Sequence, residues 1–155
     1  MNGLVLIRSI RLIRVSIVKT MPDKILYKEL ILDLYRNPLN NKELADFDTE
    51  KTGHNPSCGD RVVLRLKFDG ETISNIGWTG EGCAISMAAL SLITDEVKGK
   101  TRVEAASITE KQMIEMLGIP ISHARMKCAL LGWSTIQSAI MSSRPSPKAS
   151  GEIPS

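Results

Sequence analysis

The sequence predicts an α+β domain with an N-terminal helix, a small antiparallel sheet of about three strands, and helices packed on one face of the sheet. Three observations lead to this prediction. Apolar residues recur at helical spacing before residue 37, they alternate with charged residues between 61 and 68, and helical spacing returns after 83. Helices and strands that are segregated along the chain are typical of α+β domains. A length of 155 residues suits one such domain.

The first helix is expected over residues 23–36, where five apolar residues recur at helical spacing: Leu26, Tyr27, Leu30, Ile31 and Leu34. Asp23 can cap its start. Asn37-Pro38 ends it, because a residue before proline disfavours the helical conformation. The polar segment that follows, residues 40–55, is expected to contain a strand around Ala45–Thr49.

A β-hairpin is expected next. Along the outgoing strand, apolar and charged positions alternate, which predicts one buried face and one face exposed to solvent. The apolar positions are Val62, Leu64, Leu66 and Phe68, and the charged ones are Arg61, Arg65 and Lys67. Asp69-Gly70 is a turn signal, and Thr72–Thr79 supplies the returning strand.

Helical patterns fill the remainder of the domain. A helix is expected over Ala84–Lys98 and is closed by Gly99. Two capping boxes, Thr101…Glu104 and Thr109…Gln112, predict two short helices. A last helix is expected over His123–Met141.

The two ends of the chain are expected to lie outside the domain, which spans residues 22–141. Residues 1–21 form a basic extension with charge +4, interpreted as dispensable sequence upstream of Met21 or as an organellar transit peptide. Residues 142–155 have the composition of a disordered tail and carry +1.

Charge and hydropathy exclude two classes of partner. The whole chain carries +3, so the domain itself carries −2 and has no basic stripe with interleaved aromatic residues. Nucleic acid is therefore not an expected partner. No apolar run reaches the roughly 18 residues of a membrane helix, so no membrane association is expected.

The three cysteines, Cys58, Cys83 and Cys128, are the candidate functional residues. An odd count argues against a disulfide framework and favours reduced thiols inside a cell. Gaps of 25 and 45 residues match no zinc-finger spacing, and on spacing alone the cysteines could be small core residues. However, each cysteine falls at the boundary of an expected element.

The surroundings of each cysteine favour a thiolate that binds metal. Gly59 permits a turn that brings Cys58 and Asp60 onto one centre. Cys83 opens a helix, where the first-turn amides and the helix dipole lower a thiol pKa. The cations Arg125 and Lys127 precede Cys128 and would also favour its thiolate. Three thiolates and one carboxylate suit tetrahedral zinc.

Three motifs carry a resemblance to a known family. In order along the chain they are Ser57-Cys58-Gly59-Asp60, Gly80-Glu81-Gly82-Cys83-Ala84-Ile85-Ser86 and Arg125-Met126-Lys127-Cys128-Ala129-Leu130. Together they resemble the SufU/IscU/NifU-type iron–sulfur cluster assembly proteins over about Pro22–Ile140, and Tyr35–Pro38 resembles the N-terminal signature of that family.

The resemblance implies a function and a set of partners. It implies that Cys58, Asp60, Cys83 and Cys128 converge at one exposed end of the domain and hold Zn²⁺ or a nascent iron–sulfur cluster. It further implies that a pyridoxal-phosphate-dependent cysteine desulfurase delivers persulfide sulfur, that Cys128 receives it, and that downstream scaffold or cluster-acceptor proteins take it onward. Such a protein is a sulfur carrier or scaffold without independent turnover, located in the cytoplasm or, with a transit peptide, in an organellar matrix.

The motifs do not match one subfamily throughout. IscU-type scaffolds have a histidine immediately before the last cysteine, where this chain has Lys127, as SufU-type sulfur carriers do. SufU proteins usually have an additional segment between the second and third cysteines, for which the 45-residue gap leaves no room. A zinc-dependent carrier is therefore the expected function, with a true [2Fe–2S] scaffold as the alternative.

Other readings of the same residues stay open at this point. A structural zinc module would use the same ligands, and a Cys–His nucleophile enzyme would need an oriented histidine and an oxyanion hole. His54 is expected at the surface or a strand edge. His123 lies about 140° around a continuous helix from Cys128, so it can reach the site only if that helix begins after it.

Overall fold

The computed structural model describes residues 24–143. Three strands form one antiparallel sheet in the order β1–β2–β3: β1 Thr49–Asn55, β2 Asp60–Asp69 and β3 Thr72–Glu81. The helices are α2 Lys24–Arg36, α3 Ala84–Val97, α4 Arg102–Ala106, α5 Glu110–Leu117 and α6 Met126–Ser142, and a 3-10 turn η1 covers His123–Arg125. The predicted α+β class with a three-stranded antiparallel sheet is therefore confirmed.

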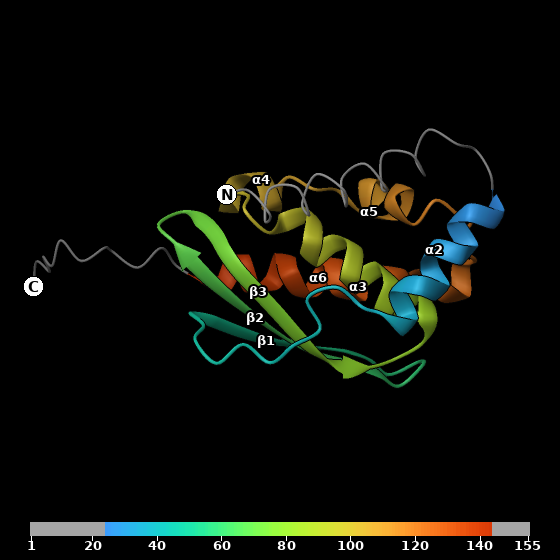
Figure 1. Cartoon of the computed structure of the whole chain (residues 1–155), viewed down its shortest axis with the longest axis horizontal. Helices are drawn as coiled ribbons and strands as arrows, with labels where there is room; N and C mark the ends of the chain where they lie inside the picture. Colours follow the sequence, from blue (N-terminus) through green and yellow to red (C-terminus); the bar gives the residue numbers. More distant parts are fainter. Residues whose placement is uncertain (1–23, 144–155) are drawn as a thin grey trace, which may run out of the picture.

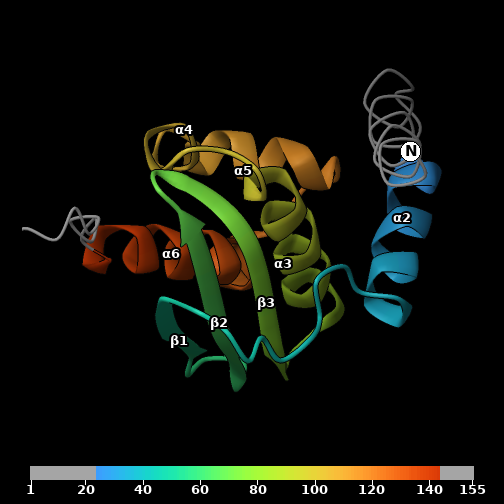
Figure 2. The same cartoon turned by 60° about the vertical axis from the view of Figure 1, so that its left-hand side comes forward.

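The helices gather on one face of the sheet (Figure 1, Figure 2). Helices α3 and α6 pack against each other and against the sheet, and α2 packs beside α3. The apolar positions of β2 that the alternation predicted, Val62, Leu64 and Leu66, are fully buried beneath these helices. The core of the domain thus lies between the sheet and the α3–α6 pair.

The opposite face of β2 carries the charged residues of the alternating pattern. Arg65 forms ion pairs with Glu43 and Glu50, and Lys67 forms one with Asp46 at 3.1 Å. The loop between α2 and β1 supplies Glu43 and Asp46 and crosses this face. Since these pairs are largely exposed, they fix the path of the loop more than they stabilise the fold.

The position predicted for the first strand is wrong. A strand was expected around Ala45–Thr49, but residues 45–48 belong to the loop and β1 runs over Thr49–Asn55. The inward positions of β1 are Gly53 and Asn55, both buried. Because neither is an apolar side chain, β1 shows no alternation of apolar and polar residues.

The final helix begins later than predicted. Residues 123–125 form the turn η1, and α6 starts at Met126 and ends at Ser142, one residue beyond the predicted Met141. The two capping boxes at Thr101 and Thr109 are confirmed. The predicted extension 1–21 and the tail beyond residue 143 lie outside the described residues. Among the helices of the described part, none is long and apolar enough to cross a membrane.

Close contact between β1 and α6 fixes how the two elements meet. A Cβ at Gly53 would lie 2.1 Å from Thr135 Oγ1 on α6, so a side chain there would force the elements apart. The same approach brings Asn55, at the end of β1, to Cys128, at the start of α6. The packing of strand on helix therefore sets the spacing of the candidate site.

We predict that Gly53→Ala lowers the free energy of unfolding by about 1 to 3 kcal/mol, since overpacking at a close backbone approach displaces both elements. Thermal or urea unfolding measures this loss. Thr135→Ala removes the clashing hydroxyl, so the double variant is expected to lose less than the sum of the two single losses. If the loss of the double variant equals the sum of the two single losses, the proposed clash between a side chain at residue 53 and Thr135 is contradicted.

Candidate metal centre

A tight turn between β1 and β2 positions two of the predicted ligands. Asn55 and Asp60 are partners in the antiparallel register, and residues 56–59 connect them. Gly59 has φ +75°, a left-handed conformation that glycine adopts without strain, and its N–H donates to the Asn55 carbonyl at 2.8 Å. As a result, Cys58 lies exposed on the turn, while the Asp60 side chain is buried.

Helix α6 adds the third member of the cluster. Cys128 is the third residue of α6, is buried, and places its Sγ 2.8 Å from Cys58 Sγ. The candidate ligand atoms of Cys58, Asp60 and Cys128 all lie within 4.8 Å of one another. Residues 70 positions apart in the sequence thus meet at one point.

Cys83 lies at the margin of this cluster. It is the N-cap of α3, and its backbone N–H donates to Asp60 Oδ1 at 3.1 Å. Its Sγ is 3.9 Å from Asp60 Oδ2. The three cysteines therefore surround the Asp60 carboxylate, although only Cys58 and Cys128 form the tight group with it.

Two further polar residues line the cluster, and the sequence analysis did not identify them. Asn55 donates from Nδ2 to Cys58 Sγ at 3.2 Å and to Cys128 Sγ at 3.6 Å. Ser86 donates from its hydroxyl to Asp60 Oδ2, and its N–H donates to Cys83 Sγ at 3.5 Å. The sequence could have indicated both residues, because each lies three positions from a candidate cysteine.

The two thiols beside Asp60 differ in acidity. Burial raises the pKa of the Cys83 thiol, but hydrogen bonds from the hydroxyl and N–H of Ser86 outweigh it, and the pKa is lowered overall. Burial, followed by the contact with Cys58 and the charges of Cys83 and Asp60, together raise the pKa of Cys128 to about 12. The predicted effect of a helix start on Cys83 is thus present.

The expectation that Arg125 and Lys127 favour a thiolate at Cys128 is wrong, because the pKa of Cys128 is raised and neither cation contributes to it. Its side chain is only 1% exposed, whereas Cys58 is exposed. Arg125 and Lys127 are exposed and form no described hydrogen bond or ion pair with the sulfurs. The helix directs these two cations outward, away from the buried side of α6 on which Cys128 lies.

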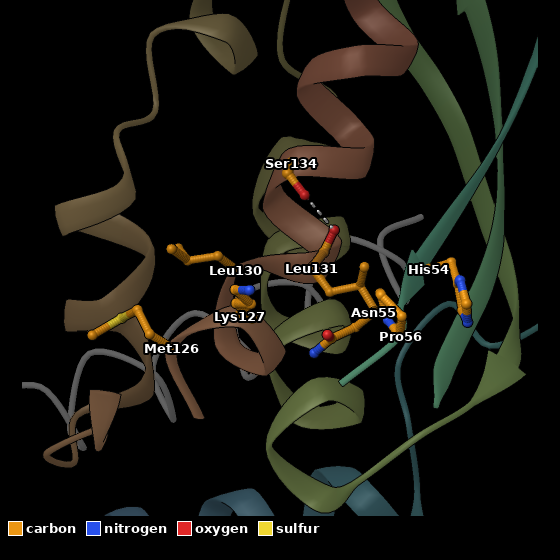
Figure 3. Close-up of a pocket in the computed structure, with 8 residues that line it drawn as sticks. All are labelled: His54, Asn55, Pro56, Met126, Lys127, Leu130, Leu131 and Ser134. Carbon is orange, nitrogen blue, oxygen red and sulfur yellow. Dashed lines mark hydrogen bonds between the residues drawn. The ribbon is translucent and has the colours of Figure 1, made fainter. Parts of the chain in front are cut away.

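Lys127 instead borders a hollow beside the site (Figure 3). The hollow has a volume of about 290 Å³ and lies between the end of β1 and the first turns of α6. Its lining residues are His54, Asn55, Pro56, Met126, Lys127, Leu130, Leu131 and Ser134. Lys127 therefore lines this hollow, and no described hydrogen bond or ion pair joins it to the cysteines.

The histidines do not complete the cluster. His54 is exposed on the edge strand β1, as predicted. His123 is exposed in η1 and, although α6 begins after it, is not part of the three-ligand group. No described histidine forms a hydrogen bond with a cysteine, so the geometry gives no support to a Cys–His nucleophile.

The cluster has the chemistry of a metal site. Asp60 is 2% exposed, and within residues 24–143 no lysine or arginine forms an ion pair with it. A buried carboxylate beside three thiols needs a cation if more than one of these groups is ionised. Soft sulfur donors with one oxygen suit tetrahedral Zn²⁺ or iron.

Comparisons with known proteins place these residues in a family context. A family model described as the NifU-like N-terminal domain matches residues 26–148. The zinc-dependent sulfurtransferase SufU of Bacillus subtilis is 34% identical over 133 residues, covering 74% of this chain and 89% of that protein. The iron–sulfur cluster assembly scaffold protein IscU of Streptococcus pyogenes is 30% identical over 132 residues, covering 74% of this chain and 82% of that protein.

One solved structure and a eukaryotic relative extend the comparison. The crystal structure of FiSufU from Fervidobacterium islandicum has a TM-score of 0.65 and 28% identity, covering 72% of this chain and 94% of that one. The mitochondrial iron–sulfur cluster assembly protein 1 of Debaryomyces hansenii is 36% identical over 135 residues, covering 82% of this chain and 74% of that protein. The fold of this chain thus recurs in a solved structure at 28% sequence identity.

We predict that, in protein stripped of metal, alkylation modifies Cys83 at lower pH than Cys128. Because its pKa is lowered, Cys83 should ionise to the thiolate at a pH below the reference thiol pKa of about 8.5. Because its pKa is raised, Cys128 should ionise only at a pH above that value. Peptide mass mapping between about pH 6 and 10 follows each site.

The variant Ser86→Ala is the matched control for this measurement. It removes the Ser86 hydroxyl that contacts Cys83 Sγ and lowers the pKa of Cys83, so the modification of Cys83 should move to higher pH. In denaturant, where the fold no longer sets the two pKa values, the difference between Cys83 and Cys128 should vanish. Equal modification of the two thiols in the folded protein would contradict the assignment.

Proposed function

The chain belongs to the family of NifU-like N-terminal domains, and we propose that it is an iron–sulfur cluster assembly protein that accepts persulfide sulfur from a pyridoxal-phosphate-dependent cysteine desulfurase. The observation that carries the proposal is the meeting of Cys58, Asp60 and Cys128 at a surface turn, with Cys83 beside them. The 34% sequence identity with a zinc-dependent sulfurtransferase over 133 residues supports the carrier function.

The four side chains fit one Zn²⁺. Cys58, Asp60, Cys83 and Cys128 would hold it, and when bound it would keep the sulfurs as thiolates at neutral pH, which offsets the raised pKa of Cys128. The chain itself orients the set: Ser86 and the Cys83 N–H hold the carboxylate of Asp60, and the turn before β2 presents Cys58.

Sulfur transfer follows from thiolate chemistry. The acceptor thiolate attacks the outer sulfur of the desulfurase persulfide, a new S–S bond forms on this chain, the old S–S bond breaks, and the desulfurase cysteine leaves as a thiolate. The reaction requires access as well as charge. We propose that Cys58 receives the sulfur, because it is exposed and Cys128, which the family resemblance assigned, is buried.

A second function is supported by a specific feature, the absence of an additional segment between Cys83 and Cys128. In this alternative the same ligands hold a [2Fe–2S] cluster as cargo, which is then passed to acceptor proteins. The relative from Streptococcus pyogenes is named as an IscU scaffold. Asp60 would be the weakest ligand of such a cluster, since a hard oxygen binds iron–sulfur centres less strongly than thiolates do.

The setting of this function is also a proposal. Free thiols and a sulfur donor call for a reducing compartment, either the cytoplasm or, if residues 1–20 are a transit peptide, an organellar matrix. The exposed cations Arg125 and Lys127 stand beside the site and are proposed to contact the desulfurase.

We predict that protein purified without affinity tags binds one zinc per chain and that Cys83→Ala loses it. The melting temperature of the variant should fall to that of wild type treated with a chelator, because metal binds the folded state only. Elemental analysis and thermal unfolding measure the two effects. Unchanged zinc content in Cys83→Ala would remove Cys83 from the ligand set.

We predict that incubation with a desulfurase and free cysteine places extra sulfur on Cys58 first. Alkylation followed by peptide mass mapping locates it. Cys58→Ser should then fail to stimulate the desulfurase, since its hydroxyl cannot form a persulfide. If the sulfur accumulates on Cys128 while Cys58 stays unmodified, solvent exposure does not determine which cysteine is the acceptor. The acceptor is then Cys128, as the family resemblance implies.

A further inference from the structure

The Asn55 side chain donates to the sulfurs of two candidate ligands at once. Its Nδ2 lies 3.2 Å from Cys58 Sγ and 3.6 Å from Cys128 Sγ, both within the range for hydrogen bonds to sulfur. Each donor position of the amide thus has a sulfur to point to. Cys58 comes from the turn and Cys128 from α6, so this amide joins two separate elements of the site.

The orientation of the amide is fixed by its other half. Asn55 Oδ1 accepts from the backbone N–H of Ser57 at 3.2 Å. A flipped amide would set its NH₂ group against that N–H donor and turn its oxygen toward electron-rich sulfurs. The NH₂ group therefore faces the sulfurs.

Because Asn55 is buried, its hydrogen bonds to the two sulfurs matter for stability. The residue is 4% exposed, at the inward-facing last position of β1. A buried amide without partners is costly, so its N–H groups must be used within the protein. Among the described side chains, the sulfurs of Cys58 and Cys128 are the partners that they find.

We propose that Asn55 is a positioning residue of the metal centre, whose amide holds the sulfurs of Cys58 and Cys128 as a pair. The proposal rests on the proposed function, in which both sulfurs bind the metal. Where lysine or arginine would neutralise a thiolate, a neutral amide lowers its electron density and leaves the charge of the site unchanged. If one of the two thiolates were released to accept sulfur from a persulfide, the amide would keep it beside the other sulfur.

The test separates this role from a purely structural one. Asn55→Ser retains a short oxygen acceptor for the turn, as serine forms similar turns, but has no donor that reaches both sulfurs. Asn55→Ala lacks both functions. Asn41→Ala is the matched control, because the Asn41 amide donates to the Trp78 carbonyl at 3.2 Å and contacts no cysteine.

The readouts are zinc affinity, by competition with a chelating dye, and the sulfur-to-metal charge-transfer bands of the Co²⁺-loaded protein. Both Asn55 variants should bind zinc about 10-fold or more weakly, in line with the usual effect of removing a group that orients a ligand. Their Co²⁺ bands should shift to lower energy, because a sulfur without N–H donors gives up charge more easily. Asn41→Ala should match wild type in both measurements.

Two results would overturn the proposal in distinguishable ways. If folded Asn55→Ser matches wild type in zinc affinity and in the Co²⁺ bands, Asn55 only forms the turn, and the metal site itself stands. If wild-type protein shows neither zinc affinity nor sulfur-to-cobalt bands, the metal site proposed for the family function fails, and the role of Asn55 fails with it.

Discussion

The buried carboxylate of Asp60 is the group on which the arrangement of the site depends. It accepts the N–H of Cys83 from the start of α3 and the hydroxyl of Ser86 from the same helix, and it lies within 4.8 Å of the sulfurs of Cys58 and Cys128. Strand β2 thereby connects to α3 and α6 through one ionisable group. A carboxylate in this position must be solvated by donors or neutralised by a cation. The protein supplies neutral donors, and the remaining charge is what a metal would balance.

Within residues 24–143, no lysine or arginine forms a described hydrogen bond or ion pair with the cysteines or with Asp60. Arg125 and Lys127 point to solvent, and the described contacts of the sulfurs and the carboxylate come from the amide of Asn55, the hydroxyl of Ser86 and backbone N–H groups. Neutral donors orient ligands without competing with the metal for their charge. The two cations are exposed, and so is Cys58.

The parts of the fold with strong side-chain patterns were predictable from the sequence. The hairpin followed from the alternation along Arg61–Phe68, and the short helices followed from the boxes at Thr101 and Thr109. Strand β1 was not predictable, because its inward positions, Gly53 and Asn55, are chosen for close approach to α6 and for hydrogen bonding rather than for apolar burial. The four candidate ligands followed from family motifs, but the burial of Cys128 and the outward direction of Lys127 depend on the rotation of α6, which local sequence does not define.

The central claim is that one metal ion is held by three sulfurs and one carboxylate oxygen, and X-ray absorption at the zinc edge tests it most directly. The account predicts, for untagged zinc-loaded protein, a first shell fitted by three sulfurs at about 2.3 Å and one oxygen at about 2.0 to 2.2 Å. Asp60→Ala should keep the three sulfurs and lose the oxygen at that distance. A shell with two sulfurs or fewer in the wild-type protein, or one that Asp60→Ala leaves unchanged, would contradict the claim.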